Sequence, residues 1–235
     1  MNRRYAILSA LLRYPDATLR ADLADIQAAI GQAGFSRQAT ARLLRLARRL
    51  GIGDAMDREE AYIRLFDRGR GTSLHLFEHV HGDTRNRGPA MIELATIYEQ
   101  SGFAMDAREL PDFLPMMLEF CAVAPAEVAQ NLMAQAAPIL DALHAKLVGR
   151  GTADSRGYAA VVAAALEEVG TAPKIEATAE QELSDAEAFA ALDAAWEDEP
   201  VSFGPESDPD QQGARAKVSA MIDRLRQARA GAAAR

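Results

Sequence analysis

The chain has 235 residues, of which 49% are hydrophobic and 26% charged, values typical of globular proteins, so a wholly disordered or fibrous chain is excluded. Its one cysteine, Cys121, cannot form an intramolecular disulfide, which also excludes cysteine-based zinc and iron-sulfur sites. The net charge is −8, and no apolar run approaches the ~20 residues of a membrane span. We therefore expect a cytoplasmic protein without membrane insertion.

The first 174 residues are predicted to be helical throughout. Apolar residues recur at helical spacing from position 7 onward, and nowhere do β-branched residues alternate with polar ones as in a strand. Pro15 is expected to end the first helix and Ser36 to cap the third. The predicted fold is an all-α, compact multi-helix bundle. Its helices are expected at about residues 7–12, 19–30, 37–50, 58–66, 73–81, 89–100, 111–123, 126–147 and 158–169.

Charge is concentrated at the C-terminal end. Residues 175–212 contain 12 acidic residues and no Lys, Arg or His, whereas residues 213–235 carry six basic residues and one acidic residue. Subtracting these contributions, −12 and +5, from the total of −8 leaves −1 for residues 1–174, a nearly neutral body that is a poor binder of nucleic acid. We predict a helical body over 1–174, an acidic, partly disordered linker over 175–212 with a docking segment near 192–203, and a basic terminal helix or tail over 213–235.

A short pattern at residues 75–79 points to metal chemistry. His75, Glu78 and His79 match H-x-x-E-H, the zinc-peptidase signature in which two histidines one helical turn apart bind zinc and the glutamate acts as base. On a helix all three would lie on one arc, but a third ligand is needed, and the spacing of Glu93, Glu99 and Glu119 singles none of them out. The structural alternative is a helix whose polar face carries two histidines and a carboxylate.

Several longer stretches identify a protein family more specifically than this five-residue motif does. They are LLRYPD at 11–16, LFDRGR at 65–70, TSL at 72–74, LFEHVHG at 76–82, RG at 87–88, AM at 90–91, DARELPD at 106–112, LP at 114–115, APIL at 137–140 and LDAAWE at 192–197. Together they resemble the respiratory nitrate reductase assembly chaperones, the NarJ-type members of the TorD-like family. The resemblance covers approximately residues 5–203.

This resemblance implies an all-helical, non-catalytic, TorD-like chaperone for the molybdenum-containing catalytic subunit of a membrane-bound nitrate reductase. Such a protein binds the N-terminal segment of that subunit, assists insertion of molybdopterin guanine dinucleotide, and delays membrane attachment until then. It keeps no cofactor stably bound, and cofactor-delivery proteins are further expected partners. The sequence departs from the family pattern at Phe113, where the family usually has histidine, and at His75, where it usually has an apolar residue.

A helical body can bind a partner helix in an apolar groove whose charged rim sets the orientation. Residues 111–120 offer a broad apolar face, for which core packing is the structural alternative, and the charged residues around two glycines in the 67–71 loop offer a rim. A helical adaptor unrelated to cofactor insertion and a zinc-dependent hydrolase are the alternative functions. The predicted partner-binding residues are Asp67, Arg68, Arg70, Glu78, His79, His81, Glu109, Asp112 and Met117.

A basic face is also expected on the third helix. Arg42, Arg45, Arg48 and Arg49 lie opposite its apolar stripe. This face is either solvated or opposed to the acidic segment of the same molecule.

Overall fold

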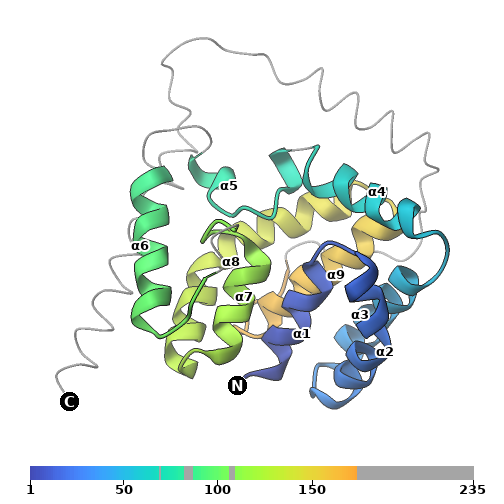
Figure 1. Ribbon diagram of the computed structural model, residues 1–235, viewed down its shortest axis with the longest axis horizontal. Coiled ribbons are helices and arrows are strands. Elements are labelled where there is room, and N and C mark those ends of the chain that lie inside the picture. The colour runs from blue at the N-terminus through green and yellow to red at the C-terminus, as the bar shows by residue number, and fades with distance from the viewer. Residues whose placement is uncertain (69, 82–86, 106–108, 174–235) are drawn as a thin grey trace, which may run out of the picture.

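The computed structural model describes residues 1–68, 70–81, 87–105 and 109–173 (Figure 1). Within these ranges the chain forms helices and no strand, which confirms the all-α prediction. Beyond the α-helices, the described ranges contain a single 3₁₀ turn, Arg70–Thr72, and one isolated bridge. The helices are α1 (Arg3–Leu12), α2 (Ala17–Gln32), α3 (Arg37–Gly51), α4 (Ala55–Phe66), α5 (Glu78–His81), α6 (Arg87–Gln100), α7 (Leu114–Val123), α8 (Ala126–Gly149) and α9 (Ala153–Glu167).

Helix starts are fixed by side chains that accept hydrogen bonds from the first backbone N–H groups. Asp16 accepts from Leu19 at 2.8 Å and caps α2, and Ser36 accepts from Ala39 at 3.1 Å, so the predicted cap of the third helix is confirmed. Thr152 and the side chain of the third residue of α9 form a reciprocal capping box. These caps satisfy N–H groups that have no partner inside the helix.

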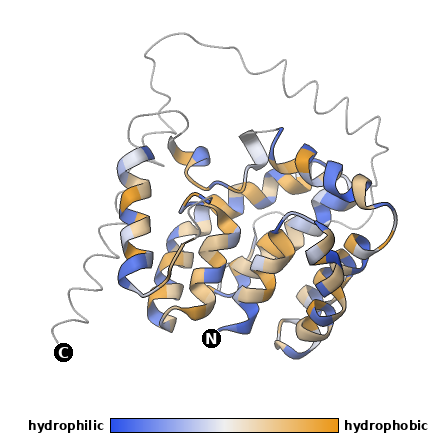
Figure 2. Ribbon diagram, in the orientation of Figure 1, coloured by the Kyte–Doolittle hydropathy of each residue, from blue (hydrophilic) through white to orange (hydrophobic). Residues whose placement is uncertain are grey.

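The core lies around α9, which is buried along nearly its whole length and packs against α1, α3 and α8 (Figure 1). Its alanines and valines allow neighbouring helices to approach from several sides, as expected for a helix that is apolar all round. In Figure 2, α7 is predominantly hydrophobic, whereas α3 carries many hydrophilic residues along its outer side. Cys121 on α7 is completely buried, and burial raises the pKa of its thiol to about 12.

The helix predicted over residues 73–81 is wrong for most of its length, because only Glu78–His81 is helical. The preceding residues bond instead to the segment before α7. Leu76 donates its N–H to the Asp112 carbonyl at 3.0 Å, and Leu114 donates to the Leu74 carbonyl at 2.9 Å. For the same reason the helix expected over 111–123 begins only at Leu114. The other expected helices are confirmed, with ends that differ by a few residues.

None of the described helices is both long and apolar enough to cross a membrane. The predicted linker over 175–212, its docking segment near 192–203 and the basic tail over 213–235 lie outside the described residues.

Candidate partner-binding site

Two segments that are distant in sequence are joined through Asp112, and we call residues 74–77 with 112–114 the Asp112 junction. The carboxylate of Asp112 is completely buried, and its Oδ2 accepts a hydrogen bond from the Phe77 backbone at 3.0 Å. A single side chain therefore satisfies a backbone N–H group that an irregular segment would otherwise bury without a partner.

Two basic side chains adjoin the buried carboxylate. Asp112 Oδ1 lies 3.3 Å from His75 Nδ1, and this hydrogen bond raises the pKa of His75 although burial opposes the shift. Arg87 Nη2 lies 3.8 Å from Asp112 Oδ2 and 3.3 Å from Glu78 Oε1. The charge of Asp112 is therefore balanced by groups from two further segments, as a buried carboxylate requires.

His75 and Phe113, the two positions at which we expected a departure from the resembled pattern, contact each other. His75 and Phe113 form the isolated bridge of the described chain, and their rings lie 5.2 Å apart at an angle of 33°. Phe113 therefore packs against the ring of His75, which is hydrogen-bonded to Asp112.

The geometry that the zinc motif requires is not formed. His75 lies before α5 with Nδ1 directed at Asp112, whereas His79 Nε2 lies 2.8 Å from the Ser73 carbonyl. Burial lowers the pKa of His79, which favours its neutral form. Among the described residues no three His, Cys, Asp or Glu side chains are placed to hold a metal ion. The structural alternative, one helix whose polar face carries both histidines and Glu78, is not formed either, because His75 precedes α5. Each histidine instead makes its own hydrogen bond.

A second candidate surface is acidic, and we define the acidic patch as Asp16, Glu59, Asp67 and Glu109 around Tyr14 and Tyr62. The Tyr14 hydroxyl donates to Glu59 Oε2 at 3.0 Å, and the ring lies edge-on to Tyr62 with 5.4 Å between centroids.

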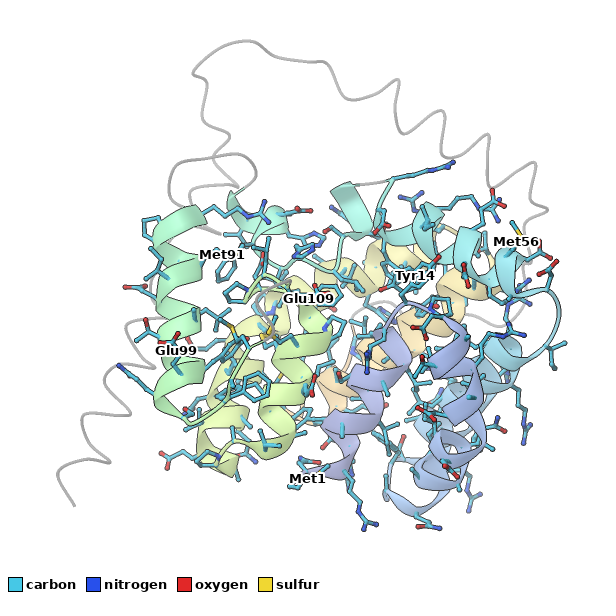
Figure 3. The ribbon with its side chains drawn as sticks, in the orientation of Figure 1. Met1, Tyr14, Met56, Met91, Glu99 and Glu109 are labelled. Atoms are coloured by element: carbon cyan, nitrogen blue, oxygen red, sulfur yellow. The ribbon has the colours of Figure 1, made fainter. Side chains whose placement is uncertain are left out.

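These carboxylates act electrostatically on the two tyrosines, and Asp67 acts on both. The pKa of Tyr62 is raised by burial and then by the charges of Asp67 and Glu109, and that of Tyr14 is raised by desolvation, by its bond to Glu59 and by Asp67 and Asp16. Asp16, Asp67 and Glu109 are exposed, and so is part of Tyr14 (Figure 3). The patch therefore combines accessible negative charge with an aromatic surface.

The loop that carries Asp67 and Arg68 is held in place by hydrogen bonds through Thr72. The Thr72 hydroxyl donates to the Leu65 carbonyl, and Arg150 Nη2 donates to Thr72 Oγ1 at 3.3 Å. Both charged residues remain exposed on this anchored loop.

The structure separates the predicted partner-binding residues into three groups. Asp67, Arg68 and Glu109 are exposed at or beside the acidic patch, and Glu78, His79 and Asp112 belong to the junction or its edge. Met117 is buried in the core, as are most residues of the expected apolar face at 111–120, so core packing is the correct interpretation of that face. The backbones of Arg70 and His81 are described, but their side chains lie outside the description.

Sequence reasoning did not single out Tyr14, Asp16, Glu59 or Arg87 as site residues. A signal was present for three of them, because Tyr14 and Asp16 lie within the LLRYPD stretch and Arg87 lies within the RG pair at 87–88. Glu59 carries no local signal, since its role depends on Tyr14, which lies outside its own helix.

Comparison with known proteins gives a consistent result. Residues 32–150 match the model of the family described as "Nitrate reductase delta subunit". The chain is 42% identical over 84% of its length to the nitrate reductase molybdenum cofactor assembly chaperone NarJ of Escherichia coli K12, covering 83% of that protein. It is 35% identical to the probable chaperone NarW of the same strain, covering 84% of this chain and 82% of NarW. It is 38% identical to the probable chaperone NarJ of Bacillus subtilis, over 54% of this chain and 69% of that one. The chain therefore belongs to the nitrate reductase delta subunit family of NarJ-type proteins.

Proposed function

We propose that this protein is a non-catalytic chaperone that assists molybdenum cofactor assembly of a respiratory nitrate reductase. The observation that carries this proposal is the 42% identity to a protein named for that role, which extends over 84% of the chain. The family match over residues 32–150 includes the Asp112 junction and three of the four patch carboxylates, Glu59, Asp67 and Glu109. The cofactor, molybdopterin guanine dinucleotide, is received by the client and is not held stably by the chaperone.

We further propose that the client is the catalytic subunit and that its N-terminal segment binds at the acidic patch. Exposed carboxylates of Asp67 and Glu109 suit Lys and Arg side chains, and the Tyr14 ring offers an aromatic face for cationic and apolar groups. The chemistry fits a basic, amphipathic segment. While that segment is covered, membrane attachment of the apo subunit in the cytoplasm is delayed.

The Asp112 junction acts indirectly in this proposal. Tyr98 donates its hydroxyl hydrogen to the Pro111 carbonyl at 2.9 Å, and Asp112 fixes the following residues against the 74–77 segment. Glu109 lies just before these two attachment points. Asp112 is therefore a positioning residue, because its buried side chain sets the path of the chain that carries an exposed carboxylate.

The chaperone role is tested by producing the reductase with and without this protein and measuring molybdenum per catalytic subunit. We expect molybdenum content to fall sharply without the chaperone while the amount of catalytic subunit changes less. Unchanged molybdenum content would contradict the role and favour the adaptor alternative.

The binding surface is tested with a fluorescent peptide that corresponds to the N-terminal segment of the catalytic subunit. The double variant D67N/E109Q removes two exposed patch charges, and the control D22N/D25N removes two exposed charges from α2. We expect the patch variant to weaken binding by about tenfold, equivalent to about 1.4 kcal/mol, and the control to bind as the unmodified protein does. Equal affinities for both variants would place the peptide elsewhere.

A further inference from the structure

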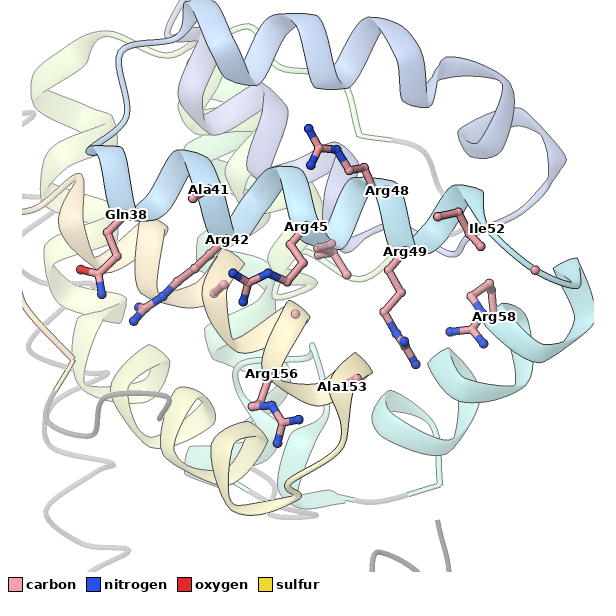
Figure 4. A pocket seen from close by; sticks show the side chains of 14 residues that line it. Gln38, Ala41, Arg42, Arg45, Arg48, Arg49, Ile52, Arg58, Ala153 and Arg156 are labelled. Carbon is pink, nitrogen blue, oxygen red and sulfur yellow. The ribbon is translucent and has the colours of Figure 1, made fainter. Parts of the chain in front are cut away.

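A groove rich in arginine lies between α3 and α9, on a surface that the proposed function does not use. Its cavity has a volume of about 690 Å³. Figure 4 shows Arg42 and Arg45 directed from α3 toward α9 across this cavity. The groove contains six arginines, Arg42, Arg45, Arg48, Arg49, Arg58 and Arg156, and we call it the arginine groove.

The groove follows from the way the two helices pack. α3 buries Leu43, Leu46 and Leu50 against the core, which turns its arginines to the outer side. A Cβ atom built on Gly157 would lie 2.8 Å from Leu46 Cδ1, so only glycine allows this close approach of α9. The arginines of α3 are thereby held beside those of α4 and α9 on one continuous surface.

The described carboxylates balance only part of this positive charge. Asp154 Oδ1 lies 2.6 Å from Arg49 Nε and 3.1 Å from Arg58 Nη1, so one aspartate serves two arginines. Among the residues that the structure describes, no carboxylate lies within ion-pair distance of Arg42 or Arg45. Like charges held this close repel one another, so an anionic occupant would lower their energy.

The chain itself contains a segment of the complementary charge. Residues 175–212 carry 12 acidic residues without a single Lys, Arg or His. Guanidinium groups pair with carboxylates in a bidentate manner, which makes an acidic peptide a better match for this groove than an isolated point charge.

α9, which forms one side of the groove, ends at Glu167, eight residues before the acidic segment begins. Arg4 Nη1 lies 3.0 Å from Glu168 Oε1, and Arg4 Nε donates to the Ala33 carbonyl at 2.9 Å. Arg4 therefore links Glu168 to Ala33. Ala33 lies five residues before Gln38, which lines one end of the groove. α3 is about 22 Å long, and about seven extended residues would run along it, so residues 175–212 are long enough to fill the groove.

We propose that the acidic segment, residues 175–212, docks in the arginine groove of its own chain. Covalent connection gives the segment a millimolar effective concentration at the groove, which favours it over an acidic segment from another molecule. Docking covers the six arginines of the groove. The protein is thereby protected from unspecific association with other polyanions. This inference does not depend on the proposed chaperone role.

Trp196 provides the test, because it is the only tryptophan of the chain and lies within the acidic segment. Fluorescence anisotropy and acrylamide quenching of Trp196 are measured on the full-length protein at low salt and at about 1 M salt, where the Debye length is about 3 Å. Docking predicts high anisotropy and weak quenching at low salt, and the loss of both at high salt.

The variant R42E/R45E should show the high-salt behaviour already at low salt. The control R3E/R13E changes the net charge equally at exposed positions of α1 and its C-cap, and should behave as the unmodified protein. Melting temperatures are compared on the same samples, and R42Q/R45Q replaces R42E/R45E if the latter does not fold. Anisotropy that stays high and salt-sensitive in the groove variant would overturn the proposal.

A charge exchange provides the reciprocal test. The variant E197R/D198R/E199R should lose docking, and combining it with R42E/R45E should restore docking. The anisotropy should be constant over about a hundredfold range of protein concentration, because the contact is intramolecular. An increase with concentration, accompanied by dimer formation in sedimentation, would assign the groove to a second copy and overturn docking within one chain.

Discussion

The α3–α9 interface and the Asp112 junction both join segments that are distant in sequence, but by different means. At the interface, a periodic row of leucines on α3 packs against small residues of α9, and many contacts share the stabilisation. At the junction, one buried carboxylate accepts a backbone hydrogen bond and adjoins His75 and Arg87. The comparison shows that many side chains share the packing of the helical scaffold, whereas the irregular segment is joined by two backbone hydrogen bonds and one buried side chain, Asp112.

The largest effect is expected at the junction. Asp112→Ala leaves the Phe77 N–H without its acceptor and removes the anion beside His75 and Arg87. We expect a loss of about 3–5 kcal/mol in the free energy of unfolding, measured by denaturant titration. Asp112→Asn keeps an acceptor oxygen and should lose less. If both variants unfold at the same denaturant concentration as the unmodified protein, the junction does not depend on this carboxylate.

A somewhat smaller effect is expected for Leu46→Ala at the α3–α9 interface. Leu46 is almost completely buried, so its truncation removes apolar contacts and leaves a cavity. We expect a loss of about 3 kcal/mol, because flanking leucines still hold the helices together. The matched control is Leu44→Ala, a half-buried leucine on the same helix, which should lose clearly less. Equal losses would contradict the assignment of Leu46 to the tight contact.

Gly157→Ala should destabilise by about 1–3 kcal/mol, because the new Cβ would lie 2.8 Å from Leu46 Cδ1. The double variant with Leu46→Ala removes the obstructing atom. We therefore expect the two losses to be less than additive in a double-mutant cycle of unfolding free energies. Strictly additive losses of unfolding free energy would show that the new Cβ is accommodated without a clash with Leu46.

The smallest effect is expected for His75→Gln and depends on pH. Asp112 raises the pKa of His75 above its ordinary value of 6.5, so the folded state binds the proton more tightly than the unfolded state. The stabilisation is complete below pH 6.5 and is lost as the pH rises through the raised pKa. The difference in melting temperature between the two proteins should thus be largest in mild acid and shrink toward alkaline pH. The lowered pKa of His79 changes stability with pH in the opposite direction, but it does so equally in both proteins. A difference in melting temperature that stays constant with pH would therefore contradict the contact between His75 and Asp112.

The sequence predicted the elements whose causes are local. Apolar spacing located α1, α2 and α3, and the short polar side chain of Ser36 marked a helix start, because both signals act within a few residues. The predicted helix over 73–81 is wrong because the Phe77 N–H donates to the Asp112 carboxylate, 35 residues away, instead of to a carbonyl within a helix. The pairing of Arg49 with Asp154 spans 105 residues and leaves no pattern in either helix alone.

The site was predicted in part for the same reason. Asp67 was named from the charges around the glycines of the 67–71 loop, and both Asp67 and Glu109 are exposed, but nothing local places Glu59 beside Tyr14. Met117 was named from an apolar stripe, a pattern that cannot distinguish a groove floor from a core. Which apolar face is covered depends on the packing of the whole bundle.

The buried Cys121 has a practical consequence for solution work. With a thiol pKa of about 12, only about one molecule in ten thousand carries a thiolate at pH 8, and the sulfur is shielded as well. Maleimide or methanethiosulfonate reagents should therefore modify a cysteine introduced at the surface and leave the native one untouched. Spin labels or dyes can be attached at chosen positions of the natural sequence without first replacing its only cysteine.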